Sequence, residues 1–263
     1  MSKLLELTIV TFIIHLIDTL AYAVRLNAVK SKQFALSSSL FNIFVLISRT
    51  ANMFQGPLIG SLIGISIATG RDPVWDVRQV IFASTIGTAV GIMLIPSFLK
   101  IFAIAVNKLE MTGSVPLILA QAFSASNIKR IAKHTMWPSL SMLPKMRYHD
   151  IPKRLLVLNM LITGVYTIGV LAAFYAATLL PAEFRLAASA SSGMINGVAS
   201  ILLTLFVDPY AAIITDQTMR GERPFTDLKI LVVLLLGTKL LGTLLGQVLL
   251  VPSARIIADF YLR

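Results

Sequence analysis

Apolar residues along the chain gather into long stretches that are separated by shorter polar segments. A transmembrane helix needs about 20 consecutive, mostly apolar residues, because the hydrocarbon core of a bilayer is about 30 Å thick. Six stretches meet this requirement: Leu4–Val24, Phe34–Ala68, Gln79–Phe102, Leu155–Leu180, Ala187–Ile214 and Ile230–Val251. The pattern predicts an all-α, polytopic integral membrane protein in which residues 1–263 form a single transmembrane domain of six spans.

The second stretch is too long for one straight crossing and too short for two crossings with a loop between them. Gly56 and Pro57 lie inside it. Proline removes a helical hydrogen bond and commonly bends a helix. We expect one long helix that bends near Pro57, with a crossing followed by a re-entrant half-helix as the alternative.

Composition agrees with a membrane protein and excludes the soluble and disordered classes. Hydrophobic residues make up 56% of the chain and charged residues only 13%, whereas a soluble domain carries about 25% charged residues. The net charge is nevertheless +11, from 23 Lys and Arg against 12 Asp and Glu. The location of these cations therefore determines how the chain is oriented in the membrane.

Lysine and arginine are concentrated in alternate loops. Of the 23 cations, 15 follow the first, third and fifth spans, and nine of these fall around the long basic loop at residues 103–154. Cytoplasmic loops carry the Lys and Arg excess. The sequence therefore predicts that this loop is cytoplasmic and that both termini lie outside.

Polar side chains recur at helical spacing inside five of the six spans. Steps of three or four residues place such side chains on one face of a helix. The sets are Thr11, His15, Asp18, Tyr22 and Arg25; Ser38, Asn42, Arg49 and Asn52; Asn159, Thr163, Tyr166 and Thr167; Ser192, Asn196, Ser200, Thr204 and Asp208; and Lys239, Thr243 and Gln247. Lipid cannot solvate these faces, so they should face one another or a wet cavity.

Two interpretations of the charged residues remain open at this stage. Asp18 or Asp208 could neutralise Arg49 or Lys239 as buried ion pairs that fix helix register. Alternatively, the charges line a functional cavity, which we favour because so many polar faces are unusual in dry protein. Two arrangements would supply the walls of such a cavity. One is a pair of inverted repeats of three spans, and the other is a homodimer that completes the cavity.

Motifs for catalysis, metal binding and nucleic-acid recognition are missing from the sequence. It has no HExxH, GxSxG, P-loop or glycine-rich dinucleotide motif, and no cysteine. His15 and Asp18 share a helix face, but two ligands do not make a metal site. We therefore expect no enzyme, no cofactor, no metal and no nucleic-acid partner.

Two segments resemble the Amj ("alternate to MurJ") family of bacterial lipid II flippases. They are Phe12–Arg25, with the sequence FIIHLIDTLAYAVR, and Phe41–Gly60, with the sequence FNIFVLISRTANMFQGPLIG. The length and the six-span layout agree, and the resemblance extends over most of the chain. It implies a multi-pass protein of the bacterial cytoplasmic membrane that moves an undecaprenyl-pyrophosphate-linked peptidoglycan precursor between leaflets.

This resemblance suggests roles for the charged residues inside the spans. Arginine and lysine are suited to phosphate contacts, so Arg49 and Lys239 are the expected pyrophosphate ligands. We expect the remaining substrate-binding residues to be Arg25, Asn42 and Asn52, and the coupling or charge-balancing residues to be His15, Asp18 and Asp208. A small-solute or ion transporter that uses the same charges, or a membrane scaffold, is the alternative.

Overall fold

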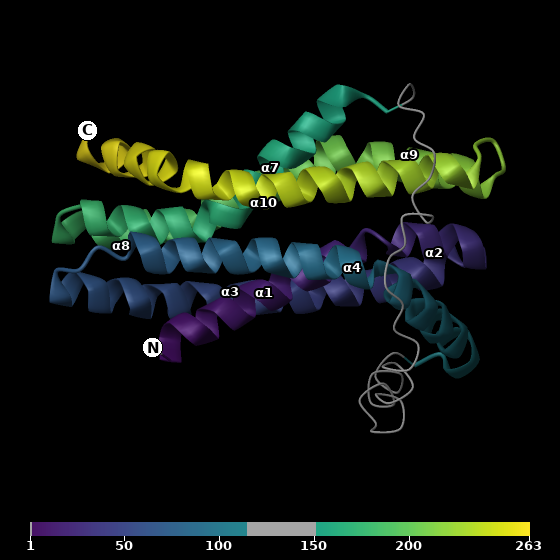
Figure 1. Cartoon of the computed structure of the whole chain (residues 1–263), viewed down its shortest axis with the longest axis horizontal. Coiled ribbons are helices and arrows are strands. Elements are labelled where there is room, and N and C mark those ends of the chain that lie inside the picture. Colours follow the sequence, from purple (N-terminus) through teal and green to yellow (C-terminus); the bar gives the residue numbers. More distant parts are fainter. Residues whose placement is uncertain (1, 115–150) are drawn as a thin grey trace.

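A computed structural model of the protein describes residues 2–114 and 151–263, and all regular elements in these ranges are helical (Figure 1). The elements are α1 (Ser2–Ala21), α2 (Val24–Ser31), α3 (Phe34–Thr69), α4 (Val74–Thr112), α7 (Lys153–Ala176), η3 (Ala177–Leu179), α8 (Ala182–Leu202), the π-helix η4 (Leu203–Val207), α9 (Asp208–Met219) and α10 (Phe225–Leu262). Six helical segments in these ranges are long and apolar enough to cross a membrane. The all-α, polytopic prediction is confirmed.

Several helices extend beyond the predicted spans. Helix α4 has 39 residues and continues from Phe102, where the apolar stretch ends, to Thr112. The extension is amphipathic, and Val106 and Leu109 are buried against residues of α2 and α3. The predicted loop at residues 103–154 thus begins inside a helix, and its middle part at residues 115–150 lies outside the described residues.

The second span is a single helix. α3 runs without interruption through Pro57, so the described chain has no re-entrant segment at this point. At about 1.5 Å per residue, its 36 residues measure about 54 Å, more than the thickness of the hydrocarbon core. The first span, by contrast, breaks after Ala21 into a turn at Tyr22 and Ala23 before α2 begins.

The described chain divides into two halves with the same packing order. In the first half, α1–α4, helix α1 packs against both α3 and α4. In the second half, α7–α10, helix α7 packs against both α8 and α10. The N- and C-termini lie at one end of the bundle, whereas α2 and α9 lie at the other, and α1 and α7 run in opposite directions (Figure 1). The halves therefore have the arrangement of an inverted repeat.

Glycines permit close contact between the first and third spans of each half. A Cβ at Gly87 of α4 would overlap the carbonyl oxygen of Phe12 in α1, and a Cβ at Gly242 of α10 would lie 2.6 Å from the carbonyl oxygen of Met160 in α7. Small residues allow helix backbones to approach each other in membranes. By contrast, Gly64 of α3 and Gly197 of α8 have no atom within 4 Å of an added Cβ.

We expect Gly87→Ala to destabilise the protein while Gly64→Ala does not. At Gly87 the added methyl meets a backbone atom that cannot rotate away, and overpacking of this kind costs about 1–3 kcal/mol. At Gly64 the methyl has free space and alanine is the better helix former by about 1 kcal/mol. Thermal unfolding of both variants in detergent measures the difference, and equal stability would contradict the close α1–α4 contact.

Candidate functional site

A polar cavity of about 440 Å³ lies between the two halves. Every spanning segment except α4 contributes to its lining. The predicted polar faces of these helices are turned toward one another at the cavity. Its polar lining residues are His15, Asp18, Tyr22, Arg25, Asn42, Arg49, Thr163, Tyr166, Ser200, Thr204, Asp208 and Lys239. The polar faces of five spans thus meet at one place inside an apolar bundle.

Seven of the eight candidate site residues lie in this lining. They are His15, Asp18, Arg25, Asn42, Arg49, Asp208 and Lys239. Asn52 is partly buried one helical turn beyond Arg49 and does not line the cavity. Tyr22 and Tyr166 were not among the candidates, although both belong to the polar helix faces that the spacing had identified.

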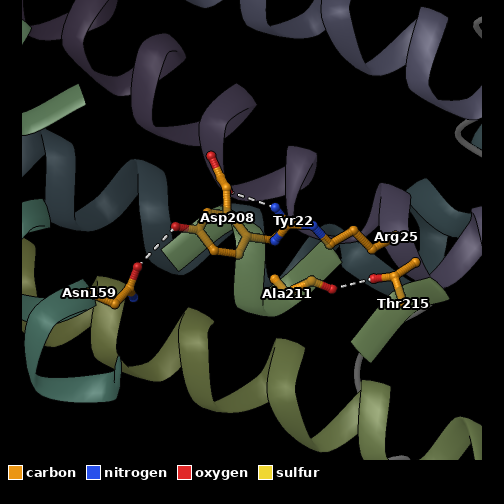
Figure 2. Close-up of polar contacts among 6 residues, drawn as sticks. All are labelled: Tyr22, Arg25, Asn159, Asp208, Ala211 and Thr215. Atoms are coloured by element: carbon orange, nitrogen blue, oxygen red, sulfur yellow. Dashed lines mark hydrogen bonds and ion pairs between the residues drawn. The ribbon is translucent and has the colours of Figure 1, made fainter. Parts of the chain in front are cut away.

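An ion pair joins the two halves at one side of the cavity. The guanidinium Nη2 of Arg25, in α2, donates to the carboxylate Oδ1 of Asp208, the first residue of α9, at 2.7 Å (Figure 2). Asp208 thus neutralises Arg25, which corrects the interpretation that it pairs with Arg49 or Lys239. The reason is local: Arg25 follows the break after α1, and the π-helix η4 directly before Asp208 changes the rotation of its side chain around the helix axis.

Lys239 is almost completely buried at the α10 side of the cavity. Its ammonium lies 5.1 Å from the centroid of the Tyr22 ring, within the range of a cation–π interaction. The carboxylate of Asp18 also attracts it, but among the described residues no carboxylate lies within salt-bridge distance of Lys239. The charge is therefore held by an aromatic face and a distant carboxylate.

A hydrogen-bond network fixes the ring of Tyr22 in place. The Tyr22 hydroxyl donates to Oδ1 of Asn159 at 3.2 Å (Figure 2). The amide nitrogen of Asn159, which is fully buried, donates to the Leu235 carbonyl oxygen at 3.0 Å and to the Thr238 hydroxyl at 2.8 Å. Residues of α7 and α10 therefore position an aromatic ring that belongs to the other half.

Arg49 extends from α3 and is exposed, although it lies inside a spanning helix. No salt bridge joins it to a carboxylate in the part of the chain that the structure describes. His15 is buried, and its Nδ1 has no hydrogen-bond partner among the residues that the structure describes. Since the cavity lining contains three basic side chains, Arg25, Arg49 and Lys239, against two carboxylates, it is complementary to an anion.

The site contains no metal-binding arrangement in the described ranges. No three histidine, aspartate or glutamate side chains gather closely enough to hold a metal ion there.

Comparisons with known proteins identify a family and a relative. The family model described as "Amj: Alternate to MurJ" matches residues 10–261. The chain is 41% identical over 248 residues to "Lipid II flippase Amj" of Bacillus subtilis (strain 168). The aligned region covers 94% of this chain and 92% of the Bacillus subtilis protein. No solved structure matches the chain.

The Arg25–Asp208 ion pair should show measurable coupling between the two halves. We expect Arg25→Asp and Asp208→Arg each to lower the melting temperature in detergent, because each leaves two like charges facing one another. The double variant, in which the two charges are exchanged, should recover most of the lost stability. We expect a coupling energy of about 1 kcal/mol, which is at the upper end of the range measured for exposed ion pairs. The exposed Lys3–Glu6 pair is the matched control and should show at most a few tenths of this coupling; additive effects at Arg25 and Asp208 would contradict the ion pair.

Proposed function

Because the chain belongs to the Amj (alternate to MurJ) family, we propose that it is a lipid II flippase. It is a multi-pass protein of the bacterial cell membrane, and it carries the lipid-linked peptidoglycan precursor from the inner to the outer leaflet. One structural observation supports this proposal most strongly: a polar cavity with excess positive charge lies inside a bundle whose outer surface is apolar. Such a cavity shelters an anionic head group while hydrocarbon stays outside.

Arg49 and Lys239 are the proposed ligands of the pyrophosphate. Arg49 forms no salt bridge within residues 2–114 and 151–263, and a cation at this depth without a carboxylate partner is stabilised when an anion arrives. Lys239 faces the same cavity from α10, on the opposite half of the molecule. The two cations together contact a pyrophosphate from both halves.

The other lining residues have supporting roles in the proposal. Asn42 lies about two helical turns from Arg49 on the same face of α3 and offers an amide to the sugars or the peptide. Asn52 lies just beyond the lining and meets the head group only as it moves along α3. Arg25 exchanges Asp208 for a phosphate on its side of the cavity, and His15 and Asp18 balance the charge around Lys239.

The size of the cavity requires a conformational change during transport. A disaccharide-pentapeptide is bulkier than the 440 Å³ enclosed here, so the halves must separate to admit it. A small solute would fit without that change, which keeps a small-solute transporter as the competing function. Uptake of a solute into proteoliposomes that contain no lipid II would support that alternative.

We expect substitutions that remove the cavity cations to abolish lipid II transport. Arg49→Ala and Lys239→Met should each reduce activity at least tenfold, because each removes a charge-assisted phosphate contact worth about 1.5–3 kcal/mol, and the double variant should be inactive. The assay is depletion of every parallel flippase in cells that express the variant, followed by measurement of the leaflet in which lipid II accumulates.

Two controls separate charge from folding in this experiment. Arg49→Lys keeps a cation and should retain more activity than Arg49→Ala. Arg255→Ala removes a cation from an exposed position outside the cavity and should leave transport unchanged. Full activity of the Arg49→Ala, Lys239→Met double variant would remove both residues from the pyrophosphate site.

We also propose that both termini lie outside the cell, with α2 and α9 near the cytoplasm. The two termini share one end of the bundle, and the cation-rich loops belong to the other end. A reporter that is active only in the periplasm or outside the cell, fused after Arg263, should be active. Activity of a reporter that works only in the cytoplasm would reverse the orientation.

A further inference from the structure

The cavity reaches the outer surface of the bundle between α3 and the α8–η4 segment. Leu46 of α3 and Thr204 of η4 both line the cavity, and both are exposed; Leu46 is 64% exposed. Although they line one cavity, α3 and α8 do not pack against each other along their lengths. The wall that residues 2–114 and 151–263 form around the cavity is therefore incomplete on this side.

The packing order of the two halves explains why the wall is open here. The third spans of the halves, α4 and α10, pack together, and each is bound through glycines to the first span of its own half. The equivalent second and fifth spans, α3 and the α8–α9 segment, have the smallest buried shares of the six. The opening lies between equivalent helices, at residues 41–49 of α3 and residues 199–208 of the α8–α9 segment, nearer to the α2 and α9 end of the bundle.

The chemistry of the opening changes from polar to apolar toward the outside. Arg49 and Thr204 are on the cavity side. The neighbouring outward positions are large and apolar: Ile47 on α3, and Ile201 and Leu205 on α8 and η4, are 42%, 57% and 62% exposed. An opening of this kind suits a ligand with an anionic head and a long hydrocarbon chain, because each part meets a surface of its own polarity.

We propose that the opening between α3 and the α8–η4 segment is a lateral portal for the hydrocarbon chain of a lipid-linked anion. The pyrophosphate lies inside near Arg49, and the polyprenyl chain leaves between Leu46 and Thr204 and remains in the bilayer throughout transport. This inference rests on the proposed flippase function and extends it to the path of the tail. A water-soluble solute would have no use for an opening that faces lipid.

Cysteine bridging across the opening tests the portal directly, because the native chain has no cysteine. The variant Leu46→Cys, Thr204→Cys is treated in membranes with bis-methanethiosulfonate reagents of graded length. We expect the bridge to form and lipid II translocation to fall at least tenfold, with recovery when the bridge is reduced.

A matched variant distinguishes a blocked portal from chemical damage. Thr50→Cys, Phe54→Cys places two cysteines one turn apart on α3, at exposed positions that do not line the cavity. Its bridge stays within α3, so activity should persist. Normal transport by the bridged Leu46–Thr204 variant, or failure of every reagent to bridge it, would overturn the portal; failure of the untreated native protein to transport lipid II would instead overturn the flippase function.

A photocrosslinking measurement locates the tail without relying on activity. A benzophenone amino acid at position 46 should capture the polyprenyl chain of lipid II at least fivefold more than one at Val248, which is 68% exposed on α10 away from the cavity. Equal capture at the two positions would place the tail in bulk lipid rather than at the portal.

Discussion

The cost of placing a charge in hydrocarbon is the constraint on which the rest of this structure depends. A lysine, arginine or aspartate at the bilayer centre must find a protein partner, a wet cavity or an anion. Here the five charged lining residues are gathered at one place, and the contacts of Arg25 with Asp208 and of Lys239 with Tyr22 each join the two halves of the molecule. The apolar outer surface and the polar interior of the bundle both follow from this requirement.

The two inverted halves divide rigidity and movement between different helix pairs. Contacts without intervening side chains, such as those at Gly87 and Gly242, hold the first and third spans of each half together. The second and fifth spans have no equivalent contact with each other. Relative movement of two rigid groups of three helices would therefore change the cavity most at α3 and α8, as transport of a bulky head group requires.

The sequence predicts the number of spans and most of the cavity lining, because both depend on periodicity within a single helix. It does not predict which charges pair. Arg25 and Asp208 meet because α1 breaks before Arg25 and a π-helix precedes Asp208, and neither irregularity interrupts the apolar pattern. Likewise, the continuation of α4 past Phe102 depends on contacts of Val106 and Leu109 with other helices, and mean hydropathy does not register such contacts.

The incomplete wall between α3 and α8 makes the surrounding membrane a component of the protein. When no substrate is bound, the apolar rim around Leu46 and Leu205 is available to the tails of ordinary phospholipids. A substrate must displace them, so its apparent affinity contains a term for lipid exchange. In the proposed portal, phospholipid acyl chains and detergent tails then compete with the hydrocarbon chain of the substrate for the same space.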